Sequence, residues 1–347
     1  MKILLLVRDR QSKAGSGRNA ANMIQAIANA GFELDILDYD GHFFSYVLRA
    51  CRAAAKADIV QVVDMNPLGF AGYVATRLTH AKFLIVAQAG YALAPLEHLK
   101  TKLLSKLAYR AADRIVAGSS FVAKEIERRV PGVHVEVIDP GIDMAKFHGA
   151  GTPRIPDAVP FMISVGAVKA RKGHDVSVRA FALAKKTIPN LRYIIIGSQT
   201  DESRFFASVR SLAQEFGVED DVEFLAGVSD EALNDFYSRA SLFILASSNI
   251  GSHIEGFGMV FLEAAAYGLP SVGTLGNGIE GAVEDGHTGI LVPQNNPEAT
   301  AQAIVKILCD KELARKMGER ARAFANEHDI PHLTKLYAQL YHGMLGR

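Results

Sequence analysis

The stretch that decides the fold reads EGFGMVFLEAAAYGLP, from Glu255 to Pro270. It follows a short apolar run, 242–245, through a polar loop. Its first two glycines allow a tight turn in which the backbone approaches a ligand closely. Residues 259–267 then predict a helix that ends at the following glycine. Because the amides and the positive dipole end at a helix start attract anions, this junction predicts a diphosphate site with a glutamate on each side.

Short apolar runs alternate with helical patterns on both sides of this stretch. Predicted strands cover 3–7, 34–37, 59–63, 83–87, 115–117 and 135–138, and then 161–165, 193–196, 222–225, 242–245, 271–273 and 290–292. Predicted helices cover 19–30, 96–112, 119–129, 174–187, 203–216, 231–239, 259–267, 299–308 and 330–345. Several runs are apolar throughout, which is typical of parallel strands covered on both faces. The chain is therefore predicted to be an α/β protein with two Rossmann-like, doubly wound parallel sheets in tandem.

One segment between the two halves, 148–156, is rich in Gly and Pro and has no hydrophobic period, so it predicts a linker. It separates a first domain, 1–150, from a second, 158–330. Residues 331–347 predict a last amphipathic helix that packs back on the first domain. Ligands of doubly wound sheets bind beyond the carboxyl ends of the strands, so we expect the two domains to face each other across a binding cleft.

Composition excludes several classes of protein. The 347 residues are 49% hydrophobic and 22% charged, which is typical of a globular chain and not of a disordered one. A net charge of +1 provides no global attraction to nucleic acid, and none is expected as a partner. Cys51 and Cys309 form no disulfide framework or metal-binding spacing. The N-terminal apolar run is too short for a signal peptide and no run could span a membrane, so we expect a cytoplasmic protein.

The residues from Glu255 to Glu263 resemble the E-x7-E motif of the retaining glycosyltransferases of family 4, which have the GT-B fold. The resemblance covers nearly the whole chain. Segment 164–173 is similar to the family's VGR…KG segment and 139–147 to its NGVD…F segment. Segment 112–119 is similar to the family's ADxxxxxS strand, and 276–279 with 283–292 complete the pattern.

This resemblance implies a retaining hexosyltransferase. It would move a sugar from a UDP- or GDP-sugar to a hydroxyl of a glycan, a lipid-linked acceptor or a small molecule. The first domain would bind the acceptor and the second the nucleotide-sugar. The leaving phosphate would take the acceptor's proton in a front-face attack, so the resemblance implies no separate base, no metal and no other cofactor.

The resemblance also implies roles for single residues. Glu255, at hydroxyls of the donor sugar, and Lys172, at the diphosphate, are the implied catalytic residues, and Glu263 would accept hydrogen bonds from the ribose. The other implied donor-binding positions act mainly through the backbone and are Gly15, Gly17, Gly166, Gly256, Phe257, Gly258, Met259 and Val260.

Two positions depart from the family pattern. Ala167 stands where the family has the Arg of its VGR segment, so one phosphate cation is missing, and Arg171 is a candidate to replace it. Gln88 stands where the family often has a His after the fourth strand. We expect Gln88 on the sugar side of the site, where it can form a hydrogen bond but cannot become charged.

Three alternatives stay open. The two departures favour a non-catalytic protein that binds sugar nucleotides or glycans. Gly15-x-Gly17-x-x-Ala20 with Asp38 fits the fingerprint of an NAD-dependent oxidoreductase, although that fingerprint places its glycines directly at the strand end. Asp38-Tyr39-Asp40 imitates the metal motif of another glycosyltransferase fold, although a solvated loop is the commoner arrangement.

Residues 96–110 predict a basic amphipathic helix with lysines beside leucines. Two interpretations stay open for it. The commoner one is a surface helix whose leucine stripe packs into the core, and we favour it here. The other is peripheral contact with an anionic membrane surface.

Overall fold

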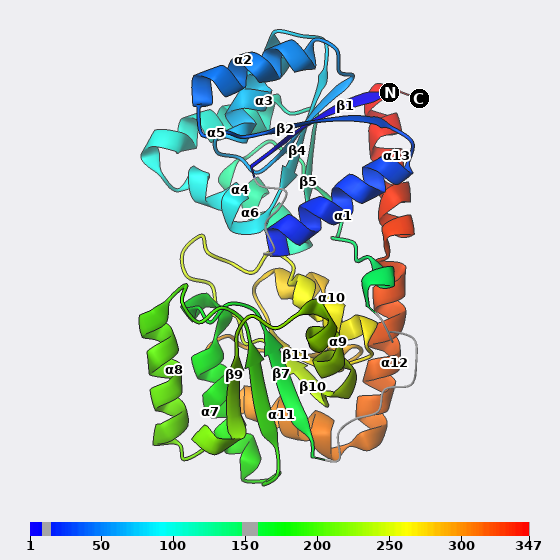
Figure 1. The fold of residues 1–347 in the computed structure, drawn as a ribbon. Helices are drawn as coiled ribbons and strands as arrows, with labels where there is room; N and C mark the ends of the chain where they lie inside the picture. Colours follow the sequence, from blue (N-terminus) through cyan, green and yellow to red (C-terminus); the bar gives the residue numbers. More distant parts are fainter. Residues whose placement is uncertain (9–14, 148–158, 347) are drawn as a thin grey trace. The chain divides into compact units, whose positions relative to one another are not determined.

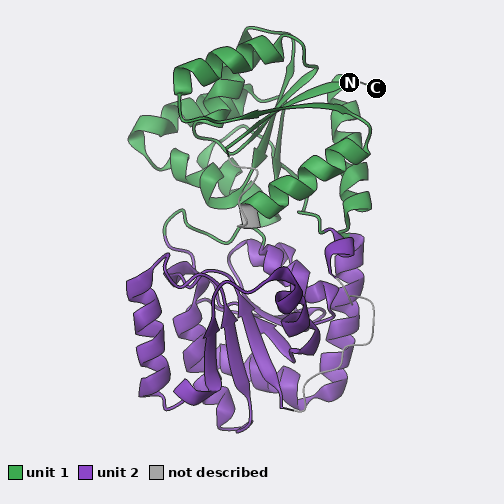
Figure 2. Cartoon of the chain, viewed as in Figure 1, with its two compact units in different colours: residues 1–142, 251–257, 328–347 green, residues 143–250, 258–327 purple. Residues whose placement is uncertain are grey.

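The computed structural model describes residues 1–8, 15–147 and 159–346. The linker predicted at 148–156 lies outside these residues. The chain divides into two compact units, shown in Figure 2. Unit 1 contains residues 1–142, 251–257 and 328–347, and unit 2 contains residues 143–250 and 258–327.

Unit 1 contains a six-stranded sheet in the order β2-β1-β3-β4-β5-β6, with its neighbouring strands parallel. The strands are β1 (Lys2–Val7), β2 (Glu33–Asp38), β3 (Ile59–Val63), β4 (Lys82–Ala87), β5 (Arg114–Ala117) and β6 (Glu136–Val137). In the register, Leu5 lies opposite Ile36 on one side and Gln61 on the other. All five residues of β3 are buried, as expected for a strand covered on both faces.

Helices cover both faces of this sheet (Figure 1). They are α1 (Gly15–Asn29), α2 (Phe43–Ala54), α3 (Leu68–Arg77), α4 (Ala89–Leu93), η1 (Ala94–Leu96), α5 (Leu99–Ala111), α6 (Ser120–Arg129) and α13 (Ile330–Leu345). One core joins α2, α3, α5 and α6 to the sheet, and the other joins α1 and α13 to its opposite face. The Tyr341 hydroxyl of α13 donates to Gln61 Oε1 at 2.6 Å, so the last helix is part of the core of unit 1.

Unit 2 repeats the plan with a parallel sheet in the order β12-β11-β10-β7-β8-β9. Its strands are β7 (Phe161–Val165), β8 (Arg192–Ile196), β9 (Val222–Leu225), β10 (Leu242–Ile244), β11 (Ser271–Thr274) and β12 (Gly289–Val292). Its helices are η2 (Met144–Lys146), η3 (Ala170–Lys172), α7 (His174–Lys185), α8 (Ser203–Glu215), η4 (Glu219–Asp221), α9 (Asp230–Arg239), α10 (Met259–Ala266), η5 (Gly278–Gly281), α11 (Pro297–Cys309) and α12 (Lys311–Glu327). Helices α7, α8 and α11 share the core on one face.

The predicted strands are confirmed to within a residue or two, and the predicted α/β class is confirmed. Four α-helices had no counterpart in the prediction: α2, α3, α4 and α12. The helix predicted at 96–112 is wrong at its start, because η1 ends at Leu96 and His98 is extended before α5 begins. In the described part of the chain, no helix combines the length and apolar composition that a membrane span needs.

The favoured interpretation of the leucine stripe was also wrong. Leu99 is 90% exposed and Leu103 is 68% exposed. Leu104 and Leu107 are each 40% exposed. Helix α5 instead buries Ser105, Ala108 and Tyr109 against the unit. This side of α5 therefore faces the core of unit 1, and the leucines face outward.

Candidate functional site

The loop that carries the predicted cations, 166–173, lies in unit 2 and follows the carboxyl end of β7. Gly166 N donates to Ile196 O at 2.8 Å, and Val168 N donates to Ser198 O at 2.8 Å. A β-carbon at Gly197 would lie 2.0 Å from Gly166 O. The loop therefore packs directly against the backbone where β8 ends.

The other side of this loop rests on the end of β10. Ser248 N donates to Arg171 O at 2.9 Å. Gly173 has φ +66°, and a β-carbon there would lie 1.8 Å from Ala246 O. Only glycine combines this left-handed conformation with such a close approach. The loop is thus fixed between the ends of β8 and β10, the two strands that flank β7.

Lys172 lies in this fixed loop and is only 9% exposed. A β-carbon at Gly166 would lie 3.6 Å from Lys172 Cε and 3.9 Å from Nζ, so the glycine leaves the lysine its space. Arg171 precedes Lys172 in η3 and is partly buried. An ammonium group held at the carboxyl edge of a parallel sheet is well placed to bind an anion.

Helix α10 begins at the second glycine of the deciding stretch. Its N-cap residue, Gly258, has φ +90° and ψ 62°, and no side chain caps the helix. A β-carbon at Gly258 would lie 2.8 Å from Phe261 Cδ2. All eight residues of α10 are buried. The amides of Met259 and Val260 stand in the first turn, where backbone donors and the helix dipole favour an anion.

Glu263 lies one turn further along α10 and is 2% exposed. The Tyr237 hydroxyl of α9 donates to Glu263 Oε2 at 3.2 Å. The Tyr237 ring stacks on Tyr267 with 5.8 Å between centroids and 10° between planes. Tyr237 thus orients the carboxylate, and no sequence motif pointed to it.

The deciding stretch is divided between the two units. Glu255, Gly256 and Phe257 belong to unit 1, whereas Gly258 and Glu263 belong to unit 2. Ser119 Oγ donates to Gly256 O at 2.6 Å, and a β-carbon at Gly256 would lie 2.4 Å from Ala89 Cβ. The sequence presented the motif as one element and gave no sign of this division.

Gln88, in the same unit, is the N-cap residue of α4, directly before Ala89. Its side-chain Nε2 is buried and has no hydrogen-bond partner among the residues that the structure describes. A buried amide nitrogen without a partner is uncommon in a folded protein.

The predicted start of the first helix is wrong. We predicted a helix over 19–30, with the implied donor-binding positions Gly15 and Gly17 before it, but α1 already begins at Gly15. Gly17 therefore lies in the first turn of α1 and not in a loop. In that turn the backbone N–H groups have no acceptor within the helix.

A buried histidine next to the cation loop escaped the prediction. His174 is fully buried. Burial, together with the nearby Lys172 charge, lowers the pKa of His174 to about 3. The ring is therefore neutral at physiological pH and adds no cation to this edge.

The Asp38-Tyr39-Asp40 motif is engaged locally. Asp40 accepts from His42 N at 3.1 Å and pairs with Arg49 at 2.5 Å. Across residues 1–8, 15–147 and 159–346, no group of three or more His, Cys, Asp or Glu side chains could hold a metal ion.

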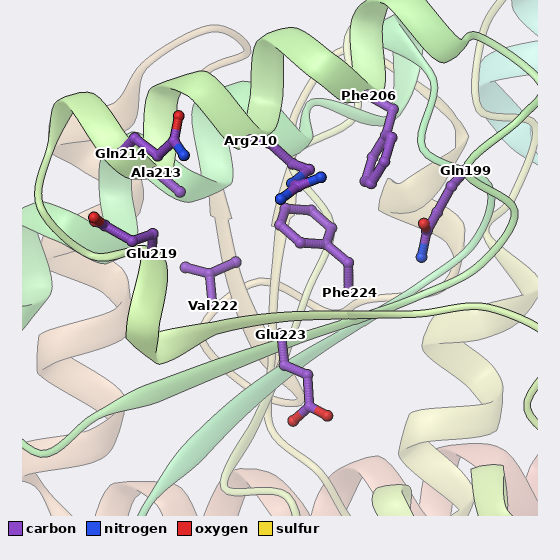
Figure 3. A pocket seen from close by; sticks show the side chains of 9 residues that line it. All are labelled: Gln199, Phe206, Arg210, Ala213, Gln214, Glu219, Val222, Glu223 and Phe224. Carbon is purple, nitrogen blue, oxygen red and sulfur yellow. The ribbon is translucent and has the colours of Figure 1, made fainter.

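A cavity of about 350 Å³ lies between α8 and the edge strand β9 in unit 2. Phe206 and Phe224 meet edge to face there with 5.3 Å between ring centroids, while Figure 3 shows Glu223 pointing away. Its lining contains none of the predicted site residues. The cavity is thus separate from the loop that carries Lys172.

Two family models match the chain. The model described as "Glycosyl transferases group 1" matches residues 151–324, and the one described as "Glycosyltransferase Family 4" matches residues 36–146.

Curated relatives agree with these models. The chain is 33% identical over 213 residues to the D-inositol 3-phosphate glycosyltransferase of Corynebacterium glutamicum (strain R), over 60% of this chain and 50% of that protein. It is 27% identical over 201 residues to a GDP-mannose-dependent alpha-(1-6)-phosphatidylinositol monomannoside mannosyltransferase of Mycobacterium tuberculosis (strain CDC 1551 / Oshkosh), over 55% of this chain and 51% of that protein. The chain thus spans about half the length of the curated relatives it matches.

A solved structure, Anabaena Alr3699/HepE in complex with UDP, resembles the whole chain with a TM-score of 0.81 at 18% identity, over 99% of this chain and 100% of that one. This likeness shows the fold, which confirms the predicted GT-B class. Because the first family model covers half of the sequence and the second covers most of unit 1, the chain belongs to the group 1 glycosyl transferases of family 4.

Proposed function

We propose that this glycosyltransferase moves a hexose from a nucleoside diphosphate sugar to an acceptor hydroxyl with retention of configuration. The observation that carries the proposal is the buried Lys172, held in a rigid loop at the carboxyl edge of the unit 2 sheet. The diphosphate leaving group gains negative charge in the transition state, and a fixed cation stabilises it without reorganisation.

The other predicted residues take complementary roles in this proposal. Residues 158–330 bind the donor and residues 1–150 the acceptor. The amides that begin α10 hold the distal phosphate, and Glu263 accepts hydrogen bonds from the ribose. Glu255 contacts the donor sugar, and Arg171 compensates for the arginine missing at Ala167. The leaving phosphate takes the acceptor's proton, so the mechanism needs no metal and no separate base.

The similar proteins support a nucleotide-sugar donor, but they differ in the nucleobase of that donor. The Anabaena protein is described in complex with UDP, and the Mycobacterium tuberculosis relative is named for GDP-mannose. We therefore propose UDP- and GDP-hexoses as the donors to test first.

The test measures release of nucleoside diphosphate and transfer from UDP- and GDP-hexoses with the whole chain. We expect Lys172→Met to lower turnover by roughly 100-fold, as loss of a preorganised charge does elsewhere. Lys169→Met is the matched control, since Lys169 lies in the same loop but pairs with Asp201 at 2.8 Å. It should keep wild-type turnover within about threefold. Equal turnover in Lys172→Met and in the control would overturn the proposal.

A non-catalytic binding protein is the second candidate, and the two departures from the family pattern, Ala167 and Gln88, favour it. The two functions separate in the same assay. An enzyme releases nucleoside diphosphate, and Glu255→Ala abolishes this release. A binding protein takes up the nucleotide-sugar and releases nothing.

We also propose that α5 contacts an anionic membrane surface. Its outward-facing Leu99 and Leu103 stand beside exposed Lys100 and Lys102, and this combination of apolar and basic groups suits a lipid interface.

Sedimentation with phosphatidylglycerol vesicles tests this contact. The pair Leu99→Ser and Leu103→Ser should lose vesicle binding, whereas Val137→Thr, at a 43% exposed position on β6, should keep it. Equal sedimentation of both variants would contradict the contact.

A further inference from the structure

We propose that Ser119 is a positioning residue for the donor sugar. Its hydroxyl fixes the peptide group between Gly256 and Phe257, so that the Phe257 N–H is presented to the sugar. The proposal rests on the function proposed above, in which the neighbouring Glu255 contacts that sugar. All four residues belong to unit 1.

Ser119 lies two residues after β5, at the start of α6, and its side chain is fully buried. Its hydroxyl has two partners. The oxygen accepts a hydrogen bond from Val122 N at 3.3 Å, which caps α6, and the proton is donated to Gly256 O at 2.6 Å. A helix cap needs only the acceptor. The single proton of the hydroxyl is therefore left for Gly256, which lies 137 residues further along the chain.

The loop 251–257 is anchored in unit 1 on both sides of Gly256. Before it, Ile254 is buried in the core that also contains residues of α4 and α6. After it, Phe257 is buried, and its ring centroid lies 6.5 Å from that of His328. Two buried side chains thus hold the loop in place, and the bond from Ser119 decides how the peptide group between them is turned.

The start of α4 supports the same loop from another side. A β-carbon at Gly256 would lie 2.4 Å from Ala89 Cβ, and a β-carbon at Gly90 would lie 3.0 Å from Ser252 O. Ala89 has φ +39°, a conformation that a non-glycine residue adopts only when its surroundings impose it. Because the loop and α4 approach so closely, there is little room for the loop to shift.

The direction of one carbonyl fixes the direction of the next amide. The Gly256–Phe257 peptide bond is trans, so its C=O and N–H groups point in opposite directions. While Ser119 holds Gly256 O, the Phe257 N–H faces away from α6. Glycine permits many backbone conformations, so without this bond the peptide group at Gly256 is freer to turn over. A backbone donor that is already aimed binds a sugar hydroxyl without the cost of ordering it first.

The experiment measures, with the whole chain, steady-state turnover of UDP-glucose and GDP-mannose and the binding of UDP and GDP by calorimetry. Ser119→Ala should lower kcat/KM for the nucleotide-sugar that the wild type turns over by about tenfold. The Kd of the corresponding free nucleotide should stay within about twofold of the wild-type value, because that ligand has no sugar. Ser119→Thr keeps the hydroxyl and should stay within about threefold of the wild-type kcat/KM.

Ser229→Ala is the matched control, because Ser229 Oγ caps α9 by accepting from Ala232 N at 3.2 Å and lies outside the proposed donor site. Both alanine variants lose a helix cap and should melt a few degrees lower, but only Ser119→Ala should lose kcat/KM. The proposal is overturned if the two alanine variants have equal kcat/KM, or if Ser119→Thr is as slow as Ser119→Ala. A failure of the proposed function is separate, because the wild type would then release no nucleoside diphosphate.

Discussion

The two sheets share one plan, yet their carboxyl edges are built differently. In unit 2 the edge is rigid: Gly173 and Ser248 fix the loop of Lys172, and Tyr237 orients Glu263. In unit 1 the edge contains Asp64, which follows β3 with φ +85°, and Gln88; Asp64 Oδ1 and Gln88 Nε2 have no hydrogen-bond partner among the described residues. A diphosphate is the same in every nucleotide-sugar, so the donor site proposed for unit 2 can be a fixed loop. The acceptor, which we propose binds unit 1, differs between enzymes.

The largest effect on donor binding is expected from a substitution that displaces the Lys172 loop of unit 2. In Gly173→Ala the new methyl would collide with Ala246 O, at a calculated 1.8 Å, in a conformation that alanine disfavours. The loop must move, so we expect donor binding to fall by roughly 100-fold and the melting temperature to drop by several degrees. Calorimetry with UDP and GDP and thermal unfolding measure both.

Gly343→Ala is the matched control, because nothing lies within 4 Å of a β-carbon at this position in α13. It should leave donor binding unchanged and should not destabilise the chain. If Gly173→Ala behaved like this control, the Lys172 loop would not be rigid, and the two edges would not differ as described.

A smaller effect, on the KM for the donor, is expected from substitution of Glu263. Glu263→Gln keeps the shape but loses an anionic acceptor, so the KM for the donor should rise by about tenfold while kcat changes less. Tyr237→Phe removes only the hydroxyl that donates to Glu263 Oε2 at 3.2 Å and should raise that KM by about threefold. Steady-state kinetics with varied donor checks both. An unchanged KM in Glu263→Gln would remove Glu263 from the donor site.

The last expected effect concerns the free energy of unfolding and not donor binding, and it is stabilising. Burial raises the pKa of Asp64 from 3.8 to about 6, so the folded state binds this proton more tightly than the unfolded chain does. The contribution of Asp64 to stability is therefore most favourable below about pH 4, declines up to about pH 6 and stays low above it. Asp64→Asn removes this penalty and should stabilise the chain by about 3 kcal/mol at pH 7.5.

Urea unfolding at pH 7.5 and pH 4.5 measures this difference. The advantage of Asp64→Asn should be full at pH 7.5 and should shrink at pH 4.5. A variant less stable than the wild type at pH 7.5 would mean that Asp64 supports the fold, and the two edges would then be alike.

The difference between the two sheet edges also explains which parts of the molecule could be predicted from the sequence. The strands and the helix that ends at Gly268 could be predicted, because apolar runs, glycines and prolines act locally. Lys172 and Glu263 could be named as candidates through the resemblance to a family whose motifs keep residue types at fixed spacing, and their roles stay predictions. Tyr237 and Asp64 could not, since their roles come from burial and from neighbours distant in the chain. The exposed leucines of α5 were misread because periodicity shows a stripe but not the side that faces the core.

The most direct test of the central claim is calorimetric titration of UDP and GDP into wild type and Lys172→Met, with Lys169→Met as the control. The account predicts that one of the two nucleotides binds the wild type and the control alike, and that Lys172→Met binds it at least about 20-fold more weakly. Equal affinity in all three proteins would contradict the claim that the rigid edge of unit 2 holds the diphosphate.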